Sequence, residues 1–225
     1  MLKRMIFLAA VAVFWVGQAQ ANPITMTFEG LRDLESINDF YNGGTGSLGS
    51  GPGPNYGVSY TPDSLAVISR DLGGSGNFSA ALTPSPGTIA FFLSGAGDTM
   101  NVAGGFDTGF SFFYTSPFFT GSVTVWDGLN GTGTLLATLN LAISAPNPGA
   151  VLPYDAWAPA GVAFAGTAHS AIFSGVANQI GFDNITLGSS TPQGPNVPEP
   201  ASLTLLGLGA MRLAGYGWRK RRQTA

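Results

Sequence analysis

The side chains that most often act as nucleophiles or metal ligands are scarce in this sequence. The 225-residue chain has no cysteine and a single histidine, His169. A serine hydrolase triad needs a histidine beside an activated serine, and no G-x-S-x-G segment is present to supply one. Thiolate zinc sites and sites with several histidines are also excluded. We interpret His169 as a surface or hydrogen-bonded strand residue.

Carboxylates are the most numerous groups that could do chemistry. Residues 22–196 contain eleven of them, and Glu29 and Glu35 are the only glutamates. Glycoside hydrolysis needs two positioned carboxylates, so a secreted hydrolase is one hypothesis. However, seven aspartates mostly adjoin Gly, Asn, Ser or Pro, where Asp favours turns; these are Asp63, Asp71, Asp98, Asp107, Asp127, Asp155 and Asp183. Turn formation explains them without catalysis, and we expect the protein not to be an enzyme.

Two glycine-containing segments resemble ligand-binding loops without meeting their requirements. Residues 127–133 offer oxygen ligands but lack the D-x-[DN]-x-[DN]-G order of a calcium loop. Residues 44–49 match G-x-G-x-x-G, but the Gly/Pro-rich segment 50–54 that follows cannot begin the required helix. We therefore predict a flexible loop there, no cofactor and no defined metal site. A structural calcium ion elsewhere in a secreted sandwich stays open as an alternative.

Asp183 and Asn184 lie within the most informative strand of the central region. Ile180 and Phe182 share one face of this strand, whereas Ile185 and Leu187 share the opposite face. The alternation changes phase at Asp183-Asn184, which predicts a β-bulge. The structural interpretation makes Asp183 a bulge residue; the functional alternative makes Asp183 and Asn184 ligand or ion contacts.

The elements that would hold these residues are nearly all short strands. Apolar and polar residues alternate over 24–29, and turn residues separate further strands at 56–60, 66–70, 89–93, 106–114, 122–126, 135–141, 161–165, 170–173 and 179–187. Leu31, Leu34, Ile37 and Tyr41 recur at helical spacing, which predicts one short helix closed by Asn42-Gly43. The fold class predicted is all-β, an antiparallel, jelly-roll-like β-sandwich with one short helix, over residues 22–190.

Charge and the N-terminal segment indicate export. Lys3 and Arg4 precede an apolar stretch, and the small residues Ala19 and Ala21 complete a signal peptide over 1–21, with cleavage after Ala21. Residues 22–196 carry two arginines against eleven carboxylates, a formal charge of −9. Such a domain repels nucleic acid, which we exclude as a partner, whereas cations and neutral glycans are permitted.

The C-terminal segment has three parts in a fixed order. After a linker at 191–196 come Pro198, Glu199 and Pro200, then an apolar run over 201–218 that is interrupted by Arg212. As a helix this run is about 27 Å long, which just spans a bilayer. The tail ends on basic residues, which predict a cytoplasmic end; these are Arg219, Lys220, Arg221 and Arg222.

Residues 197–225 resemble the PEP-CTERM sorting signal of Gram-negative bacteria: V-P-E-P-A, a Leu/Gly-rich run and a basic cluster. The resemblance implies that an exosortase, a membrane-embedded cysteine transpeptidase, recognises Pro198, Glu199 and Pro200. Arg212 departs from the usual uncharged span. The F-D-N-I sequence at 182–185 is similar to the closing strand of PEP-CTERM bodies and of sugar-binding-like jelly rolls.

The function predicted is that of an exported cell-envelope or extracellular-matrix protein. The resemblance implies transient membrane anchoring, exosortase processing, and a structural or adhesive role linked to exopolysaccharide or biofilm. The alternative is a carbohydrate-binding module, whose sugar rings would stack on aromatic residues; the candidates are Tyr56, Tyr60, Trp126, Tyr154 and Trp157.

Overall fold

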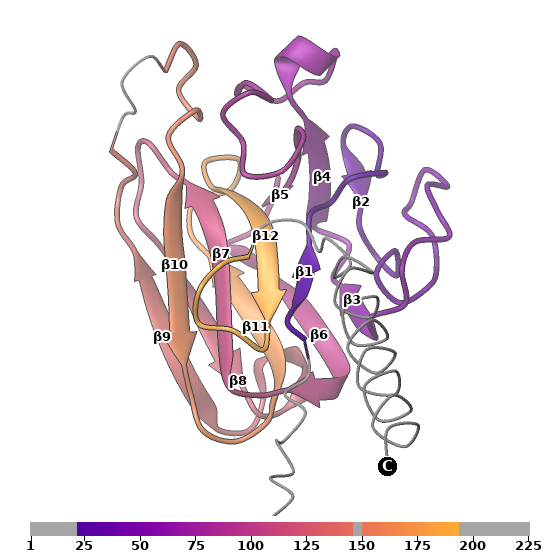
Figure 1. Ribbon diagram of the computed structural model, residues 1–225, viewed down its shortest axis with the longest axis vertical. Helices are drawn as coiled ribbons and strands as arrows, with labels where there is room; N and C mark the ends of the chain where they lie inside the picture. Colours follow the sequence, from indigo (N-terminus) through magenta and orange to yellow (C-terminus); the bar gives the residue numbers. More distant parts are fainter. Residues whose placement is uncertain (1–21, 146–149, 194–225) are drawn as a thin grey trace, which may run out of the picture.

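A computed structural model describes residues 22–145 and 150–193, which form two antiparallel β-sheets (Figure 1). The seven-stranded sheet has the order β10 (Ala158–Ala163), β7 (Gly109–Thr115), β12 (Gly181–Leu187), β5 (Thr88–Phe92), β4 (Ser64–Ile68) and β2 (Glu35–Ser36), with β1 (Ile24–Met26) also paired to β12. The five-stranded sheet has the order β3 (Val58–Tyr60), β6 (Gly97–Phe106), β11 (Ala168–Ser174), β8 (Gly121–Trp126) and β9 (Leu135–Leu141).

The described chain contains only two short 3₁₀ turns besides the strands, η1 (Arg70–Leu72) and η2 (Leu129–Gly131). Within the described ranges, no helix has the length and apolar character needed to cross a bilayer. Several predicted segments lie outside the described residues: the signal peptide, the second half of the linker (194–196), the sorting motif, the transmembrane helix and the basic tail. The all-β class and the antiparallel two-sheet architecture are as predicted.

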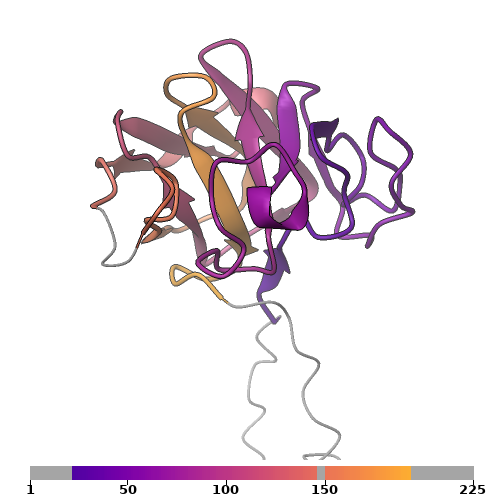
Figure 2. The same cartoon turned by 90° about the horizontal axis from the view of Figure 1, so that it is seen from above.

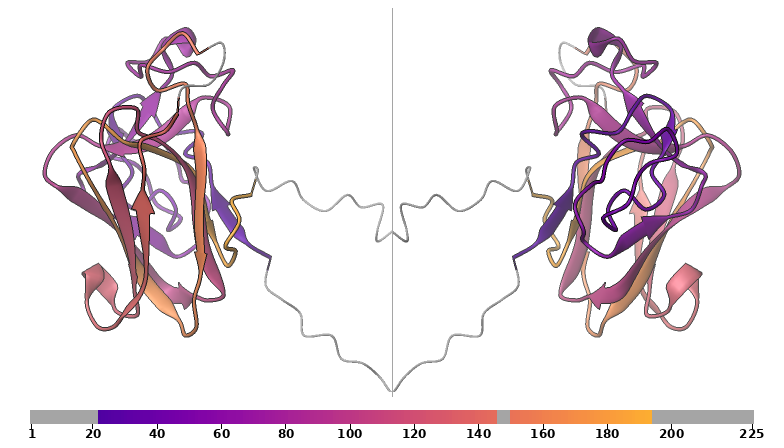
Figure 3. Two further views of the ribbon diagram at one scale, coloured as in Figure 1. Left: turned by 90° about the vertical axis from the view of Figure 1, so that its left-hand side faces the viewer. Right: turned by 90° about the vertical axis from the view of Figure 1, so that its right-hand side faces the viewer.

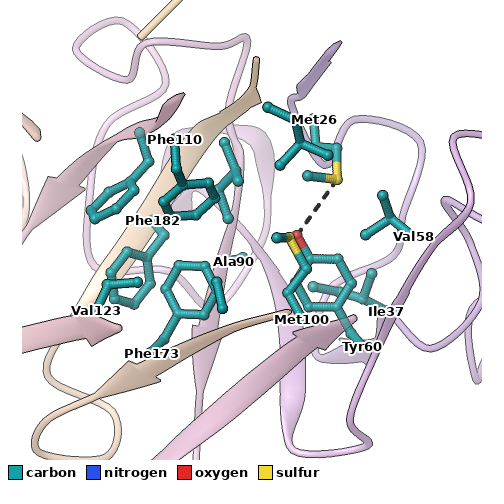
Figure 4. Close-up of a cluster of buried hydrophobic side chains, with 14 of the residues drawn as sticks. Met26, Ile37, Val58, Tyr60, Ala90, Met100, Phe110, Val123, Phe173 and Phe182 are labelled. Carbon is teal, nitrogen blue, oxygen red and sulfur yellow. Dashed lines mark hydrogen bonds between the residues drawn. The ribbon is translucent and has the colours of Figure 1, made fainter. Parts of the chain in front are cut away.

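Aromatic side chains fill the space between the two sheets. Phe112 of β7 and Phe182 of β12 come from one sheet, and Phe173 of β11 comes from the other. Figure 4 shows Phe173 and Phe182 in this cluster. The rings of Phe173 and Phe182 are 4.8 Å apart between centroids, and those of Phe112 and Phe182 are 5.6 Å apart. Both pairs are edge-to-face, the geometry that aromatic quadrupoles favour. This packing fixes the inward face of each strand.

Most of the predicted strands are present in the structure. β9 has the predicted bounds, and the other predicted strands are displaced by a few residues at their ends. The predicted strand at 106–114 is divided, because β6 ends at Phe106 and Thr108 turns the chain with a φ of 65°. β6 itself was not predicted, since its Gly, Asp and Asn residues are typical of turns.

The predicted helix at 31–41 is wrong. The segment forms turns and the two-residue strand β2, and Leu34 and Asn38 have φ values of 57° and 47°, which no right-handed helix allows. Leu31, Ile37 and Tyr41 are buried as their spacing suggested, but Leu34 is 46% exposed. The apolar residues reach the core from successive turns, so tertiary packing has overridden the local helical pattern.

β12 changes its partner halfway along. Gly181 and Phe182 pair with β5, whereas Ile185 to Leu187 pair with β1. The register of β12 against β7 shifts between Asp183 and Thr186, and Asn184 has a left-handed φ of 48°. The predicted bulge is therefore present. β1 and the end of the described chain after β12 lie on the same side of the domain (Figures 2 and 3).

Candidate functional site

The outward face of the seven-stranded sheet carries a second, smaller hydrophobic cluster. In β5, Ala90 and Phe92 belong to the main core, so alternation directs Ile89 and Phe91 to the opposite face. Val67 of β4 and Phe78 belong to the same cluster, and Trp157 packs against it. The rings of Phe78 and Trp157 meet edge-to-face at 6.5 Å. Loops 69–87 and 150–157 thus cover part of this face and leave the rest open.

A groove of about 460 Å³ opens beside this cluster. Its apolar floor comes from β4 and β5, and its rim comes from loops; the lining residues include Val67, Asn77, Phe78, Ile89, Phe91, Tyr154, Asn178 and Gln179. None of the described residues that line it carries a charge. Amide and hydroxyl groups above an apolar floor suit a neutral, hydroxyl-rich ligand better than an ion.

The polar rim of the groove is held in place by hydrogen bonds. The Tyr154 hydroxyl donates to Gln179 Oε1 at 2.9 Å, and Arg70 Nη2 donates to Asn77 Oδ1 at 2.8 Å. Burial raises the pKa of Tyr154, so its hydroxyl stays protonated at neutral pH. The Phe118 ring packs edge-to-face against Tyr154 at 6.2 Å. These contacts fix the orientation of the ring without filling the groove.

The five aromatic residues proposed for sugar stacking do not share an exposed face. Tyr60 is buried, and its hydroxyl lies 3.6 Å from Met26 Sδ in the core (Figure 4). Tyr56 stacks on Tyr41, and Trp126 donates from Nε1 to Thr124 Oγ1 on the five-stranded sheet. Only Tyr154 lines the groove.

Sequence reasoning missed most of the groove. Its floor residues belong to predicted strands, but nothing local indicated that Phe78, Asn77 and Gln179 would gather around Tyr154. The G-N-F and A-N-Q segments in which they stand have the composition of ordinary turns. The only usable signal was the unbroken apolar run of β5, which indicates a strand covered on both faces.

Two aspartates line a second depression, of about 410 Å³, beside η1. Asp155 is buried and accepts hydrogen bonds from the amides of Ser79 and Leu152 at 2.7 and 2.9 Å. Asp71 accepts from the Ala80 amide and the Ser79 hydroxyl, and the amide bond lowers its pKa. Glycoside hydrolysis needs one carboxyl held protonated by a raised pKa. Asp71 is shifted in the opposite direction, and both groups organise loops.

Asp183 lies at a third place, where β12 changes partner. Its buried carboxylate accepts from the Ser85 amide at 2.8 Å and from the Asn184 amide at 2.7 Å. Glu29, which follows β1, accepts from the Thr88 amide at 2.9 Å and lies 3.3 Å from the Ser85 hydroxyl. Burial raises the pKa of Asp183 to about 7, and the nearby charge of Glu29 adds to the shift. Three segments distant in sequence therefore meet around two carboxylates.

The remaining candidates occupy ordinary structural positions. His169 Nδ1 lies 3.3 Å from the Val102 carbonyl between paired strands. Asp127 accepts from the Thr134 amide, a bond that lowers its pKa and closes the turn before β9. Loop 43–55 is tied to Glu35, which accepts from the amides of Leu48 and Ser50 at 2.7 and 3.1 Å. Among the described residues, no group of three acidic or histidine side chains gathers as metal ligands.

Comparison with known proteins identifies the C-terminal segment. Residues 196–222 match the PEP-CTERM protein-sorting motif, which confirms the resemblance stated for this part of the chain. The match includes Pro198, Glu199 and Pro200 and the basic residues from Arg219 to Arg222; their individual roles stay predictions. A search of curated proteins gave no match.

Solved structures with a similar arrangement of strands include carbohydrate-binding modules. A module of Cellvibrio mixtus lichenase 5A, solved with cellotriose, is 15% identical over 56% of this chain and 87% of its own, with a TM-score of 0.36. A family 6 carbohydrate-binding module is 16% identical over 57% and 85%, with a TM-score of 0.37. The K3 adhesin domain of Lys-gingipain from Porphyromonas gingivalis is 15% identical over 56% and 91%, at 0.32. Similarities this low carry no information about what the chain binds.

Proposed function

We propose that this chain, which carries a PEP-CTERM protein-sorting motif, is exported and processed by an exosortase and then acts without catalysis in the cell envelope or extracellular matrix. The observation that carries the proposal is the motif match at residues 196–222. Ala19 and Ala21 would direct leader cleavage, and the helix predicted at 201–218 would anchor the chain until Pro198, Glu199 and Pro200 are recognised. The mature domain would serve a structural or adhesive role linked to exopolysaccharide.

The motif follows the folded domain after a short segment. Ser111 Oγ donates to the Ser189 carbonyl at 2.9 Å, and the Gln193 amide donates to Thr186 Oγ1 at 3.2 Å. The chain is therefore held to the sandwich as far as Gln193, three residues beyond the predicted domain end. Only four residues separate it from Pro198. A processing enzyme would meet the motif close to an already folded domain.

The test replaces Pro198, Glu199 and Pro200 with alanine in the native host. We expect loss of processing and of surface display, because the recognition residues are removed while the apolar run and basic tail stay. The matched control replaces residues 193–195 with alanine, the same number of residues just before the motif. Mature protein of unchanged mass and location in the motif variant would overturn the proposal, as would mature wild-type protein that still carries Trp218.

The groove beside Tyr154 supports a second candidate function, the binding of a neutral glycan chain. Its floor is apolar and its rim offers amides from Asn77, Asn178 and Gln179, and no charged residue lines it. An aromatic ring held by neighbouring side chains provides a face on which a sugar ring can stack. This candidate replaces the five-residue aromatic surface that the sequence suggested.

Full-length chain purified in detergent would be applied to an array of neutral oligosaccharides. Tyr154→Ala should reduce binding by about tenfold, which corresponds to the loss of about 1.4 kcal/mol of ring contact. Trp126→Ala is the matched control, since it removes a half-buried ring from the other sheet. No binding by the wild type, or equal losses in both variants, would remove this candidate and leave the sorting proposal untouched.

A further inference from the structure

We propose that the junction of β1, β5 and β12 is a calcium-binding site, formed by Glu29, Asp183 and Asn184 together with the carbonyl oxygens of Thr27 and Thr88. These groups come from three segments: the chain after β1, the start of β5, and the bulge of β12. The proposal concerns the stability of the domain and does not depend on sorting or on glycan binding.

Oxygen acceptors outnumber donors at this junction. The Ser85 hydroxyl lies within hydrogen-bonding distance of five oxygens: both Asp183 carboxylate oxygens at 2.8 and 2.9 Å, the Thr27 carbonyl at 3.2 Å, Glu29 Oε1 at 3.3 Å and the Thr88 carbonyl at 3.4 Å. A hydroxyl has one hydrogen to donate. Both Asp183 oxygens and Glu29 Oε1 also accept a main-chain amide hydrogen, so the Ser85 hydroxyl is a single donor placed among more acceptors than it can serve.

The Asn184 side chain supplies an independent sign of a missing ligand. Asn184 is 1% exposed, and its Oδ1 atom has no hydrogen-bond partner. Its Nδ2 atom lies 3.4 Å from the Pro84 carbonyl, while the neighbouring Asp183 carboxylate bonds Ser85. Both side chains of the bulge are thus directed at the same segment, 84–85. An unpaired buried amide oxygen costs about 1–3 kcal/mol, which a cation at this point would offset.

The charge at the junction is not balanced by the protein. Glu29 and Asp183 are close enough for their charges to interact. The described part of the chain has only two residues of permanent positive charge, and both are used elsewhere: Arg32 donates to the Leu48 carbonyl and Arg70 to Asn77. A divalent cation would neutralise the two carboxylates.

The set of ligands favours calcium over other ions. Two carboxylate oxygens of Asp183, one of Glu29 and two main-chain carbonyls surround the Ser85 hydroxyl. The unpaired Asn184 amide oxygen would be the sixth ligand, and calcium takes six to eight. Zinc prefers nitrogen and sulfur ligands, which are not among these groups. Magnesium retains several waters and binds few carbonyls, so a buried junction with two carbonyls suits it poorly.

The Ser85 hydroxyl now occupies the point where the acceptors converge. It lies 2.8–3.4 Å from five of them, all except the Asn184 amide oxygen, whereas calcium ligands lie at about 2.3–2.6 Å. An ion would displace this hydroxyl and draw each ligand inward by several tenths of an ångström or more. Removing the Ser85 hydroxyl should therefore preserve or strengthen binding, a result that a purely structural serine–aspartate pair would not produce.

The test is calorimetric titration of calcium into chelator-treated full-length chain in detergent, together with thermal unfolding. We expect one ion per chain and a Tm higher by about 5–10 °C at a free calcium concentration of 100 times Kd. Magnesium at the same concentration should give a smaller shift. Glu29→Gln and Asp183→Asn should weaken binding at least tenfold, whereas Ser85→Ala and the exposed-turn control Asp127→Asn should not.

Each result has a definite meaning. Absence of both heat and Tm shift for the wild type at about 10 mM calcium, well above the affinity range of extracellular modules, overturns the proposal. Binding that survives Glu29→Gln but is lost in Asp127→Asn or Ser85→Ala also overturns it. If Asp183→Asn fails to fold, the half-buried Glu29 still decides the question, because its replacement leaves the bulge intact.

Discussion

Replacement of Glu35 should release the Gly-rich loop at residues 43–55. Glu35 is fully buried in β2, and its carboxylate accepts amide hydrogens from Arg32 and Leu48, each at 2.7 Å, and from Ser50 at 3.1 Å. A hydrogen bond to a charged group contributes about 1.5–3 kcal/mol. Because the loop amides would regain water when the loop opens, we expect Glu35→Ala to lower the free energy of unfolding by about 3 kcal/mol.

Glu35→Gln keeps the side-chain volume but removes the charge and replaces one acceptor oxygen with a donor group, so it separates the effect of the hydrogen bonds from the effect of lost volume. The glutamine keeps one acceptor oxygen but places an NH₂ group against at least one backbone N–H, so we expect about half of the alanine effect. Asp39→Asn is the matched control: it removes one carboxylate charge from the same segment, but Asp39 is exposed. The measurements are urea unfolding of the full chain and limited proteolysis of the loop.

The pH dependence gives a second check on Glu35. Hydrogen bonds from Ser50, Arg32 and Leu48 outweigh the larger single effect of burial and lower its pKa. A lowered pKa stabilises the fold above the pKa of the unfolded chain, and this stabilisation is lost as pH falls through the folded value. Equal unfolding midpoints for Glu35→Ala and Asp39→Asn at pH 7, with no difference in loop cleavage, would refute the reasoning.

Three further results are expected. Burial raises the pKa of Asp98 to about 7, as it does that of Asp183, so in chelator each carboxyl should add up to about 1.4 kcal/mol of stability per pH unit as pH falls from 7 toward 4. Asp98→Asn should therefore reduce the slope measured in urea titrations across this range by the contribution of one carboxyl. Phe182→Ala should cost about 3–5 kcal/mol in the same assay, because its ring is fully buried between the sheets; a loss below 1 kcal/mol would contradict the packing. Gly161→Ala would place Cβ 2.0 Å from the Ser190 carbonyl, so cleavage between 188 and 193 by added protease should accelerate, whereas Gly104→Ala, which meets no neighbouring atom, should leave it unchanged.

The glycines at residues 44–49 show that the same spacing can occur in two different structures, a dinucleotide-binding loop and a loop packed around a buried carboxylate. Gly44, Gly46 and Gly49 match a dinucleotide fingerprint, yet in the structure they belong to the loop around Glu35. A Cβ at Gly46 would lie 2.5 Å from Glu35 Oε1, and one at Gly53 would lie 2.3 Å from the Phe40 carbonyl. The glycines therefore permit close approach to a buried carboxylate and to the backbone. The sequence correctly excluded the helix that a dinucleotide-binding loop would need after residue 49. Nothing in the sequence identified Glu35 as the group that the loop contacts.

The misplaced helix has a related cause. Leu31, Leu34, Ile37 and Tyr41 have helical spacing, and three of the four are indeed buried. The helical spacing of buried residues does not by itself specify a helix, because separate turns can place each of these residues in the core. The Tyr41 hydroxyl accepts the Phe28 amide at 2.6 Å, and the Asp39 carbonyl accepts the amide of Gly44 at 2.9 Å. These tertiary and turn bonds replace the hydrogen-bond ladder of a helix.

Local composition by itself determined the class of the domain and the identity of the C-terminal segment. Alternating side chains, few helix formers and frequent turn residues specify strands, and the sorting motif is read from consecutive residues at 196–222. The phase change at Asp183-Asn184 likewise specified a bulge, because side-chain alternation is a property of neighbouring residues.

Only the tertiary structure decided which groups meet. Ser85 and Asp183 are 98 residues apart, and Tyr154 reaches Gln179 across 25 residues, so neither the carboxylate junction nor the groove has a local signature. Their formation depends on the partner change of β12 and on loops folding over the outer face of the sheet. Such contacts follow from how strands pair and pack at long range, which the order of residues within any one segment does not encode.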